Sequence, residues 1–493
     1  MLFNSINYLV FFPVIIVFYF ILPQKLRNLW LLGASYFFYM NWNPRYAILL
    51  AAATGITYVS GLFLGYFRAQ ENIFMCKVCV AAGFFLNLGI LAYFKYADFA
   101  IENVNRLLHL LGQDTTVPRL DLVLPAGISF FVFQSLTYVM DLYRGEVKPV
   151  RNIVNYALFV SFFPQILAGP IERSKNMLVQ YETKHDFDIE QVRRGLLWMA
   201  WGLFLKLVLA DRIAVTVDMV YGAYDAYSGL EILIASILYA VQIYCDFAGY
   251  SYLAIGSARL LGFGLMENFR CPYLAMSIGD FWKRWHISLT SWFRDYLYIP
   301  LGGNRKGKVR RYINVFIIFL ASGIWHGAAW TYVIWGCLNG GLMIAEGISA
   351  PARARLRERL HIRTDRFSYG FFQRLVTFIL IDITWIFFRA DGVKTACLMI
   401  GKIVTDLRLN RISGMIYNNL GMTAQTMVIL LLSILVLTIV DIMKYRGISV
   451  TDVLFSQSMP FRWMVYMALL FAILLFGVYG RIYEQTAFLY FKF

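Results

Sequence analysis

The chain has 493 residues, of which 60% are hydrophobic and only 15% are charged, and its formal net charge is +16. Soluble domains usually carry about 25% charged residues, so this composition, with a mean hydropathy of +0.61, excludes an ordinary soluble enzyme. Nucleic-acid binding is also disfavoured despite the positive charge, because no soluble module with interleaved basic and aromatic residues is present. We therefore expect an all-α polytopic membrane protein.

Apolar segments that could enter or cross a bilayer recur along the chain. A transmembrane helix needs roughly 17 to 25 residues, and about a dozen transmembrane or re-entrant helices can be placed here. No Lys or Arg precedes the first segment and no small-residue cleavage site follows it, whereas Lys25 and Arg27 come directly after it. We therefore predict a retained span with the N-terminus outside the cell. The candidate segments are 6–22, 29–40, 46–67, 78–97, 122–143, 154–169, 195–215, 231–263, 312–349, 369–388, 427–443 and 463–479.

Two of these segments, 231–263 and 312–349, are long enough to form two helices each. The whole chain, 1–493, is expected to be a single integral-membrane domain whose last part, 391–493, adds C-terminal transmembrane helices. Six cysteines are spread along the chain, and the only CxxC pair, Cys76 and Cys79, has no second ligand pair, so no metal site is expected.

The run 239–263 carries polar side chains within an apolar context, namely Gln242, Asp246, Tyr250 and Ser251. A buried carboxylate needs a partner, and Arg259 and Lys206 are the charged candidates nearby. These polar residues either hold helices together or line a polar tunnel, and the sequence leaves both possibilities open.

An aromatic segment follows at 280–305. Its aromatic and leucine side chains recur at helical spacing, which predicts one helix that lies in the interface or lines a groove, with Arg284 and Asp280 as an i,i+4 pair. His286 lies inside this segment, either as a hydrogen-bonded interfacial residue or as a catalytic one. The stripe consists of Phe281, Trp285, Leu289, Trp292 and Tyr296.

One histidine lies in the middle of the apolar stretch 312–349, in the motif SGIWHGAAW at 322–330. An ionisable residue at membrane depth is a functional-site candidate. Histidine can stay neutral in a low dielectric and still take up a proton, so His326 is the predicted centre of the chemistry. Trp325 and Trp330 beside it either wall the site against water and pack an acyl chain or belong to the core.

Positive charge is concentrated in two short segments, one at 302–311 and one at 351–366. The positive-inside rule places both in the cytoplasm and makes 312–349 a hairpin with His326 near its turn. The first segment either fixes topology and touches anionic lipid or docks an anionic donor. Its basic residues are Arg305, Lys306, Lys308, Arg310 and Arg311.

Taken together, these motifs resemble the membrane-bound O-acyltransferase (MBOAT) family, and the first 40 or so residues are most similar to its alginate O-acetyltransferase (AlgI-like) branch. The resemblance covers most of 1–390 and depends on SFFPQILAGPIER, DFAGYSYLAIG, WKRWHISLT, SGIWHGAAW and WIFFRA. It implies a ring of helices around a central funnel, with His326 as the catalytic histidine and His286 as a supporting one. Tyr252 stands where this branch usually has Asp, which puts in doubt any acidic role there.

The resemblance also implies an activity. We expect an O-acyltransferase of the bacterial plasma membrane that moves an acetyl or other small acyl group from a cytoplasmic thioester, acetyl-CoA or an acyl carrier protein, with no bound cofactor. The acceptor would be an extracytoplasmic polysaccharide such as alginate or another cell-envelope polymer, with a separate extracytoplasmic acetyltransferase as relay partner. The supporting or tunnel residues would be Asp246, Gln242, Trp325, Trp330, Trp285, Arg284 and Tyr250.

Two other functions fit some of the same residues. Within the family, the chain could transfer D-alanine from a carrier protein to teichoic acid. Outside enzymes, His326 and Asp246 could form the proton relay of a transporter, although the repeat symmetry of many transporters is not visible in the sequence.

Overall fold

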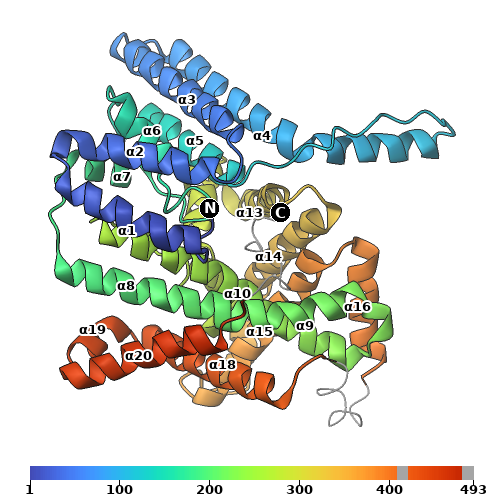
Figure 1. Ribbon diagram of the computed structural model, residues 1–493. Coiled ribbons are helices and arrows are strands. Elements are labelled where there is room, and N and C mark those ends of the chain that lie inside the picture. The colour runs from blue at the N-terminus through green and yellow to red at the C-terminus, as the bar shows by residue number, and fades with distance from the viewer. Residues whose placement is uncertain (408–419, 480–493) are drawn as a thin grey trace. The chain divides into compact units, whose positions relative to one another are not determined.

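The computed structural model describes residues 1–407 and 420–479, and their regular structure is entirely helical (Figure 1). Seven helices in these residues are long and apolar enough to cross a membrane, which confirms a multi-pass membrane protein. They are α3 (Tyr46–Ala69), α4 (Ile73–Leu110), α10 (Gly229–Leu260), α14 (Trp330–Arg359), α15 (Phe367–Arg389), α18 (Ala424–Tyr445) and α20 (Met459–Phe476). Part of the predicted C-terminal region, 408–419 and 480–493, lies outside the described residues.

The chain forms two compact units, one of Met1–Met199 with Ser251–Met266 and one of Ala200–Tyr250 with Glu267–Phe493. Helix α10 contributes residues to both units. The expectation of a single membrane domain stays a prediction, and each unit is described by itself. Besides α3, α4 and the end of α10, the first unit contains α1 (Ile6–Ile21), α2 (Gln24–Met40), α5 (Ile128–Arg144), α6 (Ile153–Ser161), α7 (Ser174–Glu182) and most of α8 (Ile189–Leu203).

In the first unit, two segments with Gly and Pro interrupt the helices. Helix α5 begins after Gly127, whose φ of 74° is left-handed, and α6 ends at Ser161 before a non-helical stretch. Phe162 and Phe163 in that stretch are fully buried. Irregular backbone at membrane depth is tolerated only where protein or a water-filled cavity surrounds it, and here protein encloses it.

The second unit carries both predicted histidines. Its further elements are the π-helix η1 (Phe204–Ala210), α9 (Asp211–Gly222), η2 (Tyr224–Ala226), η3 (Pro272–Leu274), α11 (Ile278–Arg284), α12 (Ile287–Phe293), the π-helix η4 (Arg294–Tyr298), α13 (Gly307–His326), α16 (Val393–Thr405) and α19 (Val450–Phe455).

Two expectations about helix boundaries were wrong. The run 231–263, expected as two helices, forms the single helix α10, and no proline interrupts it. The aromatic segment, expected as one helix, breaks into α11, α12 and η4, because His286 is left-handed with a φ of 43°. Tertiary backbone bonds replace helical ones at the break: the Arg270 N–H donates to the Arg284 carbonyl and the Ile287 N–H to the Asn268 carbonyl, each at 2.9 Å.

The predicted hairpin over 312–349 is present as α13 and α14, and His326 is the last residue of α13. The two helices approach closely at Gly323 and Gly336. A Cβ at Gly323 would collide with the Tyr332 carbonyl oxygen, and one at Gly336 with the Phe319 carbonyl oxygen. Small residues of this kind let membrane helices pack backbone to backbone.

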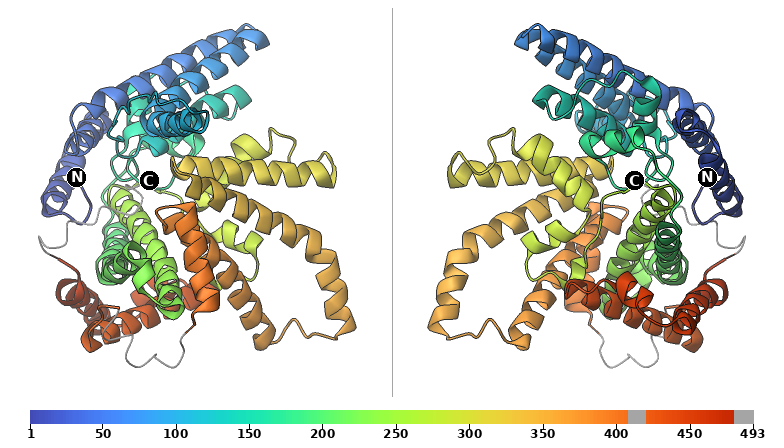
Figure 2. Two further views of the ribbon diagram at one scale, coloured as in Figure 1. Left: turned by 90° about the vertical axis from the view of Figure 1, so that its right-hand side faces the viewer. Right: turned by 90° about the vertical axis from the view of Figure 1, so that its left-hand side faces the viewer.

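Helix α14 continues past this contact and bends along its length (Figure 2). It contains Pro351, which removes a helical hydrogen bond and is a common cause of helix bending. The bend lies toward the basic end of the helix, ahead of Arg357 and Arg359 in its last turn.

Gly336→Ala should destabilise the protein, because its new methyl group meets backbone that cannot rotate away. Overpacking of this kind costs about 1 to 3 kcal/mol and should lower the melting temperature measured in detergent. Gly341→Ala is the matched control in the same helix, since nothing lies within 4 Å of a Cβ there. Equal melting temperatures for the two variants would contradict the close contact.

Candidate functional site

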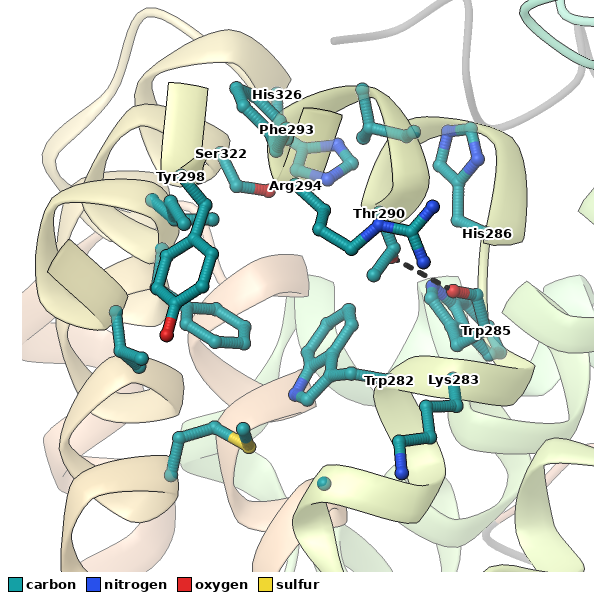
Figure 3. Close-up of a pocket in the computed structure, with 16 residues that line it drawn as sticks. Trp282, Lys283, Trp285, His286, Thr290, Phe293, Arg294, Tyr298, Ser322 and His326 are labelled. Carbon is teal, nitrogen blue, oxygen red and sulfur yellow. Dashed lines mark hydrogen bonds between the residues drawn. The ribbon is translucent and has the colours of Figure 1, made fainter. Parts of the chain in front are cut away.

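A cavity of about 220 Å³ in the second unit brings His286 and His326 together (Figure 3). One wall is a single face of α13, because its lining residues recur every three or four positions. At 1.5 Å per residue, this face extends roughly 16 Å along the helix, with His326 at its end. The α13 residues are Val315, Ile318, Phe319, Ser322 and His326.

The facing wall is built from α11, α12 and η4, which the break at His286 folds around the cavity. The side chains on this wall are mostly apolar. Gly279 and Met343 of α14 also line the cavity. The residues are Trp282, Lys283, Trp285, His286, Leu289, Thr290, Phe293, Arg294 and Tyr298.

Cations stand at the surface end of this cavity and histidines at its buried end. Lys283 is exposed and the Arg294 side chain is 64% exposed, whereas His326 is 6% and His286 only 1% exposed. The cavity therefore connects a positively charged opening with two enclosed imidazoles through an apolar interior. This arrangement suits a long, thin ligand with an anionic head.

The ring of His326 lies within an aromatic cage. Its centroid is 5.1 Å from that of Trp325, 5.0 Å from that of Trp335 and 5.3 Å from that of Phe388. Such surroundings exclude water and strengthen electrostatic interactions at the imidazole. A base held here reacts in a medium of low polarity.

His286 is held by hydrogen bonds that the sequence did not predict. Its Nδ1 lies 3.0 Å from Oδ1 of Asn268, and its ring packs edge to face on Phe247 with the centroids 4.7 Å apart. Burial lowers the pKa of His286 to about 3, so the imidazole is neutral at physiological pH. Trp325 lies between the two histidines, with its centroid 6.1 Å from that of His286.

The predicted polar residues Gln242, Asp246 and Tyr250 of α10 lie elsewhere in the second unit. Asp246 accepts a hydrogen bond from Lys206 Nζ at 2.6 Å, and Asp211 lies 2.8 Å from the same nitrogen. Lys206, not Arg259, is therefore the partner of Asp246. Gln242 and Tyr250 are buried as well, and none of these residues lines the cavity. This placement favours a structural role for the buried ion cluster.

Of three further predicted residues, two do not line the cavity and one does. Trp330, predicted to wall the site, is 49% exposed and does not line the cavity. It begins α14, where the chain leaves the hairpin turn. Arg284 is absent from the lining and pairs with Asp280 at 2.8 Å. Trp285 does line the cavity, as expected.

The predicted docking cations, Arg305, Lys306, Lys308, Arg310 and Arg311, are all exposed. Three of them lie in the first turns of α13, at the end of the helix away from His326. Cations at a helix N-terminus oppose the helix dipole, so helix stability does not account for them. Asn314 ties the preceding loop to α13 by donating to the Gly303 carbonyl at 2.9 Å, one residue before Val315 of the cavity wall.

Sequence inspection missed Asn268, Ser322 and Thr290. Ser322 lies one turn before His326, and this i,i+4 spacing could have placed it on the same face. No local pattern marks Asn268, because an irregular stretch and α11 separate it from His286. Among residues 1–407 and 420–479, no three His, Cys, Asp or Glu side chains are grouped as metal ligands.

Lys206→Met should destabilise the second unit strongly, because it leaves Asp246 and Asp211 buried without their shared cation. Removing one partner of a buried pair costs roughly 3 to 5 kcal/mol, which should lower the melting temperature in detergent by many degrees. Arg194→Met is the control, because its partner Glu190 is 64% exposed and such surface pairs contribute less than about 1 kcal/mol. A Lys206→Met protein as stable as the control would show that the cluster is not structural.

Comparisons with known proteins are consistent with this geometry. A sequence model of the membrane-bound O-acyltransferase family (MBOAT) matches residues 146–390, which include both histidines. A probable alginate O-acetylase AlgI of Pseudomonas putida is 36% identical over 402 residues, 81% of this chain and 80% of that protein. A peptidoglycan O-acetyltransferase of Helicobacter pylori is 35% identical over 80% of this chain and 78% of that protein. A teichoic acid D-alanyltransferase of Streptococcus thermophilus is 28% identical over 66% of this chain and 86% of that protein.

Proposed function

Because this chain belongs to the membrane-bound O-acyltransferase family and is an O-acyltransferase, we propose that it moves an acetyl or similar small acyl group from a cytoplasmic thioester to an extracytoplasmic polysaccharide. The observation that carries this proposal is the cavity that joins exposed Lys283 and Arg294 to both buried histidines. A thioester arm is long, thin and largely uncharged, and its carrier is anionic. Both properties match the cavity.

His326 serves as the general base. It takes the proton from the acceptor hydroxyl, and the hydroxyl oxygen attacks the thioester carbonyl. The tetrahedral intermediate then collapses, the carbon–sulfur bond breaks, and the leaving thiolate receives the proton from His326. The new ester and a free thiol are the products. Ser322, which lines the cavity one turn away, is placed to donate a hydrogen bond to the developing oxyanion.

The size of the cavity favours a short acyl group. Aromatic rings of Trp282, Trp285, Phe293 and Phe319 occupy its walls, and the cage around His326 leaves the imidazole tightly enclosed. About 220 Å³ must hold both the acyl group and part of the arm. An acetyl group is small enough to meet this limit.

The donor is an anionic thioester carrier, acetyl-CoA or an acyl carrier protein, and the exposed cations from Arg305 to Arg311 attract it. We infer the class of acceptor from the relatives at 35 to 36% identity, whose names specify alginate O-acetylation and peptidoglycan O-acetylation. We accordingly place the protein in a bacterial plasma membrane with an extracytoplasmic acetyltransferase as relay partner. D-alanyl transfer is the second candidate, because the D-alanyltransferases are also relatives, at lower identity.

The transporter alternative is set aside because the chain is an acyltransferase. Its supposed relay also lacks support in the geometry. Asp246 is bound to Lys206 and does not line the cavity that holds His326.

His326→Ala should reduce acyl transfer by a factor of about 100 to 10,000, the usual effect of losing a general base. Expression and melting temperature should stay near wild type. The measurement is mass spectrometry of O-acetyl groups on envelope polymers, in a strain that lacks the chromosomal copy. His109→Ala, which changes an exposed histidine, is the control. Activity of His326→Ala within about threefold of wild type would rule out this assignment.

Neutralising Arg310 and Arg311 to Gln should raise the donor concentration needed for half-maximal transfer, and the difference from wild type should shrink as salt screens the remaining charges. The same change at Arg45 and Arg193, which are exposed in the first unit, should have no such effect. The side of the membrane can be tested with Asn304→Cys in a Cys397→Ser background. Labelling of intact cells by an impermeant maleimide at position 304 would contradict a cytoplasmic donor site.

A further inference from the structure

Asn268 is the residue that holds His286 in place. It is 1% exposed, and its Oδ1 lies within hydrogen-bond distance of three groups. These are Nδ1 of His286 at 3.0 Å, the Ser288 hydroxyl at 2.9 Å and the Ser288 backbone N–H at 3.3 Å. A single buried carbonyl oxygen therefore organises the chain on both sides of the break between α11 and α12.

The partners of Asn268 define which ring nitrogen of His286 carries the proton. A backbone N–H can only donate, so the Asn268 atom facing Ser288 must be the carbonyl oxygen and not the amide nitrogen. That same oxygen faces His286 Nδ1 and can only accept. Nδ1 must therefore carry the hydrogen, and in a neutral imidazole Nε2 is then the acceptor.

The backbone near Asn268 reinforces this arrangement. His286 has a φ of 43°, a left-handed conformation that is unfavourable for a residue other than glycine. It is held there by two backbone hydrogen bonds, each 2.9 Å long, from Ile287 N–H to the Asn268 carbonyl and from Arg270 N–H to the Arg284 carbonyl. The segment 268–270 thus fixes both the main chain and the imidazole of His286.

We propose that Asn268 is a positioning residue for acyl transfer, which fixes the Nδ1–H tautomer of His286 and so dedicates Nε2 to accepting a hydrogen bond at the cavity. Its link to activity rests on the proposed function, whereas its link to the tautomer does not. In this tautomer Nε2 cannot donate, so His286 cannot stabilise an oxyanion there. It can instead accept a hydrogen bond from a substrate O–H or N–H and orient that group toward His326.

The tautomer can be measured directly. The chain has only five histidines, His109, His185, His286, His326 and His361, so ¹⁵N-imidazole labelling in detergent gives few signals. The His286→Gln variant assigns the His286 signal by its loss. We expect a protonated Nδ1 and an unprotonated Nε2 in the wild type. Asn268→Leu keeps the side-chain volume and removes the acceptor 3.0 Å from Nδ1, which leaves the more distant Ser288 hydroxyl at 3.4 Å. The Nδ1–H signature should then be lost, and its persistence would overturn the proposal.

Two variants protect this test from a folding artefact. Asn268→Asp keeps an acceptor oxygen, so Nδ1 of His286 should stay protonated, and an unprotonated Nδ1 there would also overturn the proposal. Asn87→Leu removes another fully buried asparagine, in α4 of the first unit, and should leave the His286 signal unchanged. A change in Asn87→Leu as large as in Asn268→Leu would show that the signal reports general loosening and would count against the proposal.

Activity supplies an independent readout, because a residue that acts through His286 has no effect once His286 is gone. Asn268→Leu and His286→Ala should each lower transfer, and the double variant should be no worse than His286→Ala alone. If the activity losses of the two single variants multiplied in the double variant, Asn268 would affect transfer by a route other than His286. If His326→Ala kept its activity while the tautomer responded as expected, the proposed function would fail and the role of Asn268 toward His286 would remain.

Discussion

The position of the site depends on the contact between α13 and α14 at Gly323 and Gly336. In lipid, helices gain little from burying apolar surface against each other, so close van der Waals packing has to hold them. These two glycines let the backbones touch three residues before His326. The same contact sets the rotation of α13, and that rotation turns the face from Val315 to His326 toward the cavity. A bulkier residue at either glycine would move His326 and the cavity wall together.

Polar chemistry in the second unit is divided between two places. At the cluster of Lys206, Asp211 and Asp246, charged groups satisfy one another within 2.8 Å and face no cavity. At the cavity, the deep polar groups are two imidazoles and a few hydroxyls among aromatic rings. The charged groups of this cluster therefore neutralise one another within the structure, while the cavity keeps groups that can exchange protons without carrying a permanent charge.

The sequence predicted the features that follow from local pattern. Hydropathy identified the spans. The basic segments flanking 312–349 indicated the hairpin, with His326 at its turn. Each of these predictions depends on the residues in or directly beside one segment, so local sequence patterns were enough to make it.

What the sequence could not predict depends on contacts between distant segments. The regular spacing from Phe281 to Tyr296 favours one helix, but backbone bonds from residues 268 and 270 break it at His286. Asp246 had two possible partners, and only the packing of η1 against α10 selects Lys206. Trp330 was predicted to line the site because it lies only a few residues after His326 in the sequence. The direction of the chain after the hairpin turn leaves it half exposed instead.

The cavity also has a shape and a charge distribution that would fit an amphiphilic molecule. Its exposed Arg294 and Lys283 would bind a sulfate or carboxylate head, and its aromatic walls would hold a narrow alkyl tail that ends beside His326. Anionic surfactants and free fatty acids thus share the shape and charge of the proposed donor. An anionic detergent used to extract this protein should therefore compete with the donor in the assay, whereas a neutral, bulky detergent should leave the cavity open.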